Sequence, residues 1–294
     1  MAGRLRLVAF VLALAIAGPT RVFAQIDLAG EWTTVPHEDL RIGMGARLLG
    51  DYTGLPINEA ARLRADTWDA SLQSTREHQT IVYPAASWVF PAGGMRISKI
   101  VDDLIQREVA LKIYKIGGAG STTRWIWMDG RPHPPEYAAH SWWGFSTGVW
   151  EGDMLTVTTT HVKAGWIRAN GVPASDRVTL TEHIVRHGNV LTIITLVVDP
   201  VYLEEPYISS LSWTFDPGQQ LIAPPPSEIV DELPGRPDGF VPHHLPGTNS
   251  ALHQFADTHK LPFEATRGGK ETIYPEYQIT LQQLMASLAR RGSK

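Results

Sequence analysis

The sequence predicts a mainly β protein, an antiparallel meander closed into a barrel or a curled sheet. Glycine and proline are scattered between short β-rich runs, and 10 tryptophans lie among these runs. Turn signals recur at Glu151-Gly152-Asp153 and His187-Gly188-Asn189, each between two runs rich in Val, Thr, Ile and Leu. Regular reversals of this kind are typical of neighbouring antiparallel strands in a barrel.

The first 24 residues have the features of a secretory signal peptide. Two arginines precede the apolar run Leu7–Ala17, and Val22-Phe23-Ala24 forms a cleavage signature. We therefore expect 1–24 to be removed and 25–294 to form a single β-rich domain in the periplasm or outside the cell. The apolar run is shorter than the roughly 20 residues that a membrane helix needs, so we expect no membrane span after processing.

Composition excludes several classes of function. The chain has no cysteine, which excludes disulfides, thiolate nucleophiles and cysteine metal sites. The whole chain has a net charge of −4, and loss of the three leader arginines leaves 23 basic against 30 acidic residues, a net charge of −7. A nucleic-acid partner is not expected, because phosphate binding needs a basic surface.

The elements before the central hairpins begin with a strand at Asp27–Trp32. Asn58–Ala70 is expected to form a short helix, because Asn58 can accept hydrogen bonds from the free amides of a first turn. Two strand pairs follow within Ile97–Met128, and the glycines of Gly117–Gly120 permit a tight reversal between them.

Two further hairpins, a proline-rich strap and a terminal helix are predicted for the rest of the chain. Thr147–Trp150 pairs with Met154–His161, and Val178–Arg186 pairs with Val190–Val198 around the two turn signals. The proline-rich stretch 222–247 is expected to be an extended strap across the barrel surface or mouth. Residues 277–291 are expected to form a packed terminal helix. Its apolar residues recur at helical spacing at Leu281, Leu284, Met285 and Leu288.

Five motifs carry a resemblance. They are Asp27-Leu28-Ala29-Gly30-Glu31-Trp32, Asp129-Gly130-Arg131-Pro132-His133-Pro134-Pro135, Trp150-Glu151-Gly152-Asp153-Met154-Leu155-Thr156-Val157, Asn170-Gly171-Val172-Pro173-Ala174-Ser175-Asp176 and Asp199-Pro200-Val201-Tyr202-Leu203. As a set they resemble a widespread family of secreted bacterial proteins over nearly the whole mature chain. The resemblance implies secretion but no particular reaction. Gly30-Glu31-Trp32 also resembles the G-x-W of lipocalin-like barrels, which implies a barrel of that kind.

Three residues are the candidate acid–base groups. Alternation on Met154–His161 places His161 at the end of the row that contains Leu155, Val157 and Thr159. On the next strand Glu182 and His183 point to opposite faces, so only one of them can face a cavity. Either His183 meets His161 there, or Glu182 orients His161. Both arrangements predict general acid–base catalysis, because imidazole titrates near neutral pH.

The loop after His161 supplies candidate substrate-binding residues. Lys163 and Arg168 are expected to hold an anionic substrate group, and Arg168 can do so with a bidentate fork. Trp143, Trp166 and Tyr202 are expected to line a pocket for a flat apolar ligand. The alternative is that the cations are solvated and the aromatic rings pack in the core.

The sequence predicts no cofactor and no metal site. It contains no nucleotide-binding or hydrolase motif and no H-E-x-x-H, and His161, His183 and Glu182 lack a metal-binding spacing. Our leading hypothesis is a periplasmic, cofactor-independent lyase that acts on a small aromatic or apolar substrate with a carboxylate or hydroxyl. The alternatives are a periplasmic carrier of an apolar molecule without turnover, and a structural protein of the cell envelope.

Overall fold

The computed structural model describes residues 26–35, 48–79, 81, 84–89, 93–116, 121–222, 228–237 and 239–292. The predicted signal peptide, the loop 117–120 and part of the predicted strap lie outside these residues. Within the described part, no helix is both long enough and apolar enough to cross a membrane.

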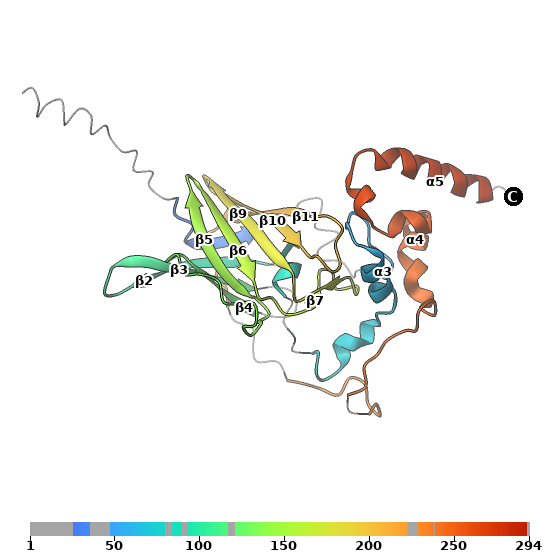
Figure 1. The fold of residues 1–294 in the computed structure, drawn as a ribbon, viewed down its shortest axis with the longest axis horizontal. Helices are drawn as coiled ribbons and strands as arrows, with labels where there is room; N and C mark the ends of the chain where they lie inside the picture. Colours follow the sequence, from blue (N-terminus) through green and yellow to red (C-terminus); the bar gives the residue numbers. More distant parts are fainter. Residues whose placement is uncertain are drawn as a thin grey trace, which may run out of the picture.

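The predicted barrel is confirmed (Figure 1). Nine strands close in the order β1-β11-β10-β9-β6-β5-β4-β3-β2, because β1 pairs with both β2 and β11. The strands are β1 (Gly30–Thr34), β2 (Met95–Asp102), β3 (Arg107–Ile116), β4 (Ser121–Trp127), β5 (Phe145–Glu151), β6 (Met154–Thr160), β9 (Thr179–His187), β10 (Val190–Val198) and β11 (Tyr207–Phe215). The short pair β7 (Gly165–Trp166) and β8 (Pro173–Ala174) lies in the connection between β6 and β9.

Alternation of side chains explains the interior. On β10 the residues Leu191, Ile193, Thr195 and Val197 are buried, while the residues between them are partly exposed. The same parity on the other strands fills the barrel with apolar side chains. The largest of these are Trp32 and Trp213, both fully buried.

One joint of the barrel differs from the predicted meander. β4 and β5 run parallel, and only Ile126↔Ser146 and Trp127↔Thr147 pair between them. A parallel pair needs a crossover connection rather than a hairpin, and residues 128–144 provide it. All other strand pairs of the barrel are antiparallel.

A second core closes one end of the barrel. Helix α3 (Glu59–Asp66) contributes Ala61 and Ala65 to it, and Asn58 caps the helix by accepting from the Ala61 amide at 3.0 Å. The predicted helix Asn58–Ala70 is too long. It stops at Asp66 because Asp69 caps a separate 3-10 turn, η1 (Ala70–Ser74), through the Ser71 amide.

The C-terminal part lies beside α3 (Figure 1). It contains η3 (Ser250–His253), α4 (Gln254–His259), η4 (Phe263–Thr266), η5 (Lys270–Ile273) and α5 (Tyr277–Gly292). The predicted terminal helix is therefore present, but none of its described side chains is buried. In the strap, the contacts described run to the segment around η1. His244 donates its amide to the Thr67 carbonyl, and Asp231 pairs with Arg76.

Candidate ligand pocket at the parallel joint

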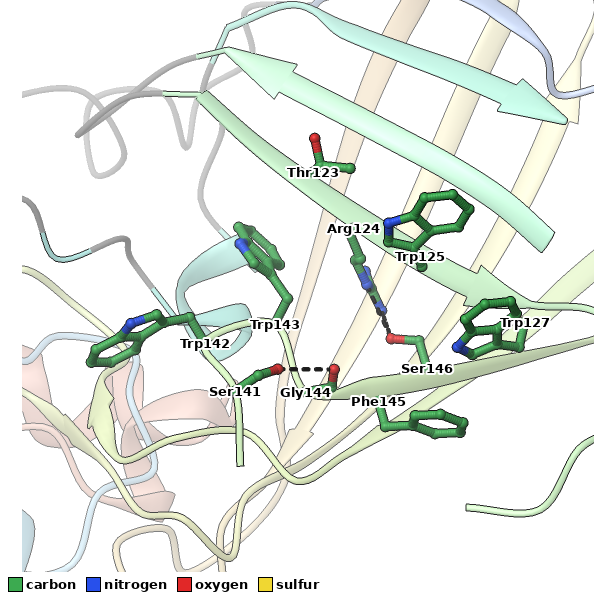
Figure 2. Close-up of a pocket in the computed structure, with 10 residues that line it drawn as sticks. All are labelled: Thr123, Arg124, Trp125, Trp127, Ser141, Trp142, Trp143, Gly144, Phe145 and Ser146. Atoms are coloured by element: carbon green, nitrogen blue, oxygen red, sulfur yellow. Dashed lines mark hydrogen bonds between the residues drawn. The ribbon is translucent and has the colours of Figure 1, made fainter. Parts of the chain in front are cut away.

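A pocket of about 470 Å³ lies where β4 and the start of β5 separate (Figure 2). Its lining comes from both faces of the barrel wall: Thr123, Trp125 and Trp127 alternate with the buried Arg124 on β4, and Ser146 is buried on β5. The complete lining is Thr123, Arg124, Trp125, Trp127, Ser141, Trp142, Trp143, Gly144, Phe145 and Ser146. Pockets of this size and aromatic content are typical of small-molecule sites.

A tight turn before β5 opens this space. The Ser141 hydroxyl donates to the Gly144 carbonyl at 3.1 Å, and the Ser141 amide donates to the His161 carbonyl at 3.0 Å. Gly144 has φ +65°, and a Cβ there would lie 2.3 Å from the Thr160 carbonyl oxygen. Only glycine fits this position without backbone strain. The turn directs two neighbouring indoles, Trp142 and Trp143, to the pocket.

Cationic side chains lie over Trp125, Trp127 and Trp142 of the pocket lining. Trp125 and Trp127 stack on each other, with centroids 5.8 Å apart. The distances from the cation to the ring centroid are 5.7 Å for Lys112 over Trp125, 3.6 Å for Arg131 over Trp127 and 5.2 Å for Lys163 over Trp142. Arg131 is also paired with Asp129. The charged side chains named at these rings are three cations and one carboxylate, an excess of positive charge on a protein whose net charge is negative.

The floor of the pocket contains a buried ion pair. Arg124 donates to both carboxylate oxygens of Glu182, one at 2.8 Å, and the two side chains are 2 % and 0 % exposed. Arg124 also donates to the Ser146 hydroxyl at 3.2 Å and to the Thr159 hydroxyl at 2.8 Å. Glu182 is thus the residue of its strand that faces inward, and its carboxylate is engaged by Arg124 rather than by His161.

A second buried cation belongs to the same polar layer. Lys115 follows the inward parity of β3 and lies 5.7 Å from the centre of the Trp213 ring. Burial lowers the pKa of Lys115 to about 7, against the opposing effect of the Glu182 carboxylate, and Arg124 lowers it further. An amine of this kind changes its charge near neutral pH, so it sets the net charge of the barrel interior.

The expected meeting of His161 and His183 is wrong. His183 pairs with Thr156 across the β6–β9 ladder on the outward face, where Nδ1 lies 3.1 Å from the Thr156 hydroxyl. His161 follows the last residue of β6 and has φ +58°, so it leaves the inward row of that strand. The two imidazoles therefore lie at different places along the barrel wall.

His161 instead belongs to a chain of hydrogen bonds with His133. The Thr160 hydroxyl lies 2.7 Å from Nδ1 of both rings, and His161 Nε2 lies 3.0 Å from the Pro135 carbonyl. Because a carbonyl only accepts, His161 Nε2 carries a proton. With both rings neutral, Thr160 donates to His161 Nδ1 and accepts from His133 Nδ1. Burial and the nearby His161 lower the pKa of His133, whose ring packs on Phe145 of the pocket.

The predicted substrate-binding residues divide into two groups. Trp143 lines the pocket, and Lys163 lies over its Trp142. Arg168 lies elsewhere and is not a solvated loop cation, because its guanidinium is buried beside Asp51 at 3.6 Å. Tyr202 packs against the second core, and Trp166 lies in β7, outside the residues that line the pocket.

Two of the motifs have a structural explanation. The Asp199 carboxylate accepts from the Ser175 amide at 2.6 Å and from its hydroxyl at 2.7 Å, and it also accepts from the Val201 amide. Nearby, Asn170 donates to the Asp51 carbonyl at 2.8 Å. These buried groups hold loops together, which accounts for their residue types without a role in chemistry.

The sequence analysis missed Arg124 and Lys115. A signal for Arg124 was present, because it shares the inward face of its strand with Ile126, where a charged side chain is unexpected. In the part of the chain that the structure describes, no group of three or more His, Asp or Glu side chains is arranged to hold a metal ion. Compared with known proteins, the chain matches no family model and none of the curated proteins.

Proposed function

We propose that this protein binds a small aromatic molecule that carries a carboxylate, in the pocket between β4 and Ser141–Ser146. The observation that carries this proposal is the set of lining indoles, with cations over Trp125, Trp127 and Trp142. Indoles favour a flat apolar ring, and the positive rim favours an anion. Following the signal-peptide features, we place this function in the periplasm or outside the cell.

The rim rather than the floor is the expected place for the carboxylate. Arg124 already donates to both oxygens of Glu182, so a ligand anion there would have to displace a buried partner. Lys163 is exposed and lies over Trp142, and Lys112 lies over Trp125. A carboxylate at the rim meets these ammonium groups while the aromatic ring lies among the indoles. Such exposed charge pairs weaken with salt.

Binding of 2-naphthoate and its neutral isostere 2-naphthamide tests this proposal. We expect naphthoate to quench tryptophan fluorescence with a Kd in the micromolar range, roughly 1 to 100 μM, and to bind several-fold more tightly than the amide at low salt. Trp142→Ala should weaken both probes, whereas Lys163→Gln should weaken only naphthoate. Lys270→Gln, which removes an exposed cation of η5, is the matched control. Equal affinity for both probes would contradict the anionic class, and unchanged binding by Trp142→Ala would contradict the pocket.

A second candidate function is lyase-type turnover of such a ligand without a cofactor. It is favoured by the chain His133–Thr160–His161, which can pass a proton beside the pocket residue Phe145. Product formation from a naphthoate or hydroxybenzoate library, followed by mass spectrometry, tests it. A true acid–base role predicts that His133→Gln lowers turnover by about 10²- to 10⁴-fold while His183→Gln does not. Binding without any product supports the carrier function alone.

A further inference from the structure

A layer of polar side chains crosses the interior of the barrel. Its members are all buried, and each points inward from a different strand: Lys115 on β3, Arg124 on β4, Ser146 on β5, Thr159 on β6, Glu182 on β9 and Thr195 on β10. Ser146 pairs directly with Thr159, and Glu182 pairs directly with Thr195. The rest of the barrel interior is largely apolar. Burial of polar groups in such a place is costly, so apolar packing alone does not account for the layer.

The pocket reaches this layer from outside the barrel. It lies where β4 and β5 separate, and Arg124 and Ser146 belong both to its lining and to the layer (Figure 2). In the β3–β4 ladder Lys115 pairs with Thr122, two positions before Arg124. Residues related in this way point to the same face and lie about 7 to 8 Å apart. The side chain of Lys115 therefore begins about one side-chain length from Arg124, at the inner end of the pocket.

Lys115 differs from the other lysines in its surroundings. Of the lysines that the structure describes, it alone is buried. Its ammonium group lies 5.7 Å from the centre of the Trp213 ring, and its charge is opposed by Arg124 and favoured by Glu182. Burial is the largest effect and lowers the pKa of Lys115 to about 7. About half of the molecules therefore hold a neutral amine at pH 7, whereas an ordinary lysine is almost fully protonated there.

A desolvated amine beside a second cation is the form of lysine that attacks carbonyl carbons and forms Schiff bases. We propose that Lys115 forms an imine with the carbonyl group of an aromatic aldehyde or ketone. The pocket is the way in for this ligand. The site thus rests on the proposed function, because the indoles of the pocket bind the aromatic ring, and it adds a carbonyl group to the class of ligand. A carboxylate at the other end of such a ligand meets the cations at the rim.

Imine formation at Lys115 needs no oxidant or reductant. The neutral nitrogen forms a bond to the carbonyl carbon, the π electrons of the carbonyl group move to its oxygen, and a proton passes from nitrogen to oxygen. The resulting carbinolamine loses its hydroxyl group and the remaining nitrogen proton as water, and the nitrogen lone pair forms the C=N bond. One amine and one carbonyl compound thus give one imine and one water molecule. When the imine takes up a proton, Glu182 favours its positive charge as it favours that of the ammonium group.

Reductive trapping of the purified protein with 2-naphthaldehyde tests the proposal. Sodium cyanoborohydride adds hydride to the imine carbon and leaves a stable secondary amine, and peptide mapping by mass spectrometry identifies the labelled lysine. At pH 7 we expect Lys115 to carry at least about tenfold more label than Lys270, an exposed lysine of η5. Lys115→Met should lose this label, while Lys112→Met, on the outward face of the same strand, should keep it. Mapping of the wild type gives the answer even where Lys115→Met does not fold.

Two further readouts concern the state of the amine and the way in. From pH 8 to pH 10 the preference for Lys115 over Lys270 should fall by more than about tenfold, because an ordinary lysine gains neutral amine over this range and Lys115 is already neutral. At about ten times its Kd, 2-naphthoate should slow the labelling of Lys115 roughly tenfold, since it occupies the same pocket.

The outcomes separate this site from the proposed function. If 2-naphthoate binds but 2-naphthaldehyde labels all lysines alike, or prefers Lys163 at the rim, the imine at Lys115 is wrong and the proposed function stands. If Lys115 is labelled selectively but 2-naphthoate neither binds nor competes, the imine site stands and the proposed function is wrong. Selective labelling that 2-naphthoate slows supports both.

Discussion

Replacing Lys115 with methionine should remove a rise in stability that the wild type shows between neutral and alkaline pH. Lys115 is 6 % exposed, and burial lowers its pKa to about 7 from the ordinary lysine value of 10.5. Between these two values the unfolded chain binds the proton and the folded chain does not. The free energy of unfolding of the wild type therefore rises with pH in this window.

The expected magnitude follows from the width of the window. One proton contributes about 1.4 kcal/mol per pH unit, and the group is half titrated at pH 7, so the wild type should gain roughly 3 kcal/mol relative to Lys115→Met between pH 7 and pH 9.5. Below pH 7 both states hold the proton, and the difference should become constant. In that range the variant should be the more stable protein, because it no longer buries a charge beside Arg124.

Urea unfolding followed by tryptophan fluorescence at pH 6, 7, 8, 9 and 9.5 measures this difference for both proteins. Other titrating groups are shared by the two chains and cancel in the comparison. Lys112→Met, on the outward face of the same strand, controls for the loss of one lysine. A difference between wild type and Lys115→Met that does not change with pH would refute the reasoning, as would a relative loss of wild-type stability in alkali.

Three other predictions concern the walls of the pocket. Arg124→Met leaves Glu182 buried without its partner and should lower the free energy of unfolding by about 3 to 5 kcal/mol in urea titrations, with recovery in Arg124→Met/Glu182→Leu. The pKa of His133 is lower in the folded protein than in the unfolded chain. His133 therefore contributes to the stability of the folded protein above the ordinary histidine pKa, and this contribution is lost as pH falls. The loss of stability from pH 7.5 to pH 5 should therefore be smaller in His133→Gln. Gly144→Ala should destabilise by more than about 1 kcal/mol and weaken naphthoate binding.

Local patterns predicted most of the barrel. The turn signals at Gly152 and Gly188 correctly marked two hairpins, and alternation correctly placed Leu155, Val157 and Thr159 on the inward face. The parallel joint between β4 and β5 was not predictable in this way. A local pattern shows that a strand exists, but the partner of that strand is decided by long-range pairing and by the path of the crossover.

The candidate site was predicted less well for the same reason. Alternation of side chains along the strand predicted that Glu182 and His183 point to opposite faces. Which of the two points into the barrel is decided by how the strand packs against β6 and β10. Arg124 meets Glu182 across 58 positions of sequence, so no local spacing connects them. The expectation for His161 failed because the chain turns out of the strand there, at a positive φ. Lys163 and Trp143 were chosen for their residue types and lie on different connections; Trp143 lines the pocket, and Lys163 lies over its Trp142.

The short parallel joint has a consequence for access to the interior. β5 and β6 are paired over seven residue positions, whereas β4 and β5 are paired over two. Opening of β4 from β5 thus breaks few ladder bonds and leaves the other strand pairs in place. Amides on both sides of this joint should exchange with deuterium by local fluctuation, ahead of the rest of the wall. A bound ligand that bridges Trp127 and Phe145 would slow that exchange. The frequency with which β4 and β5 separate would then depend on whether the pocket is occupied.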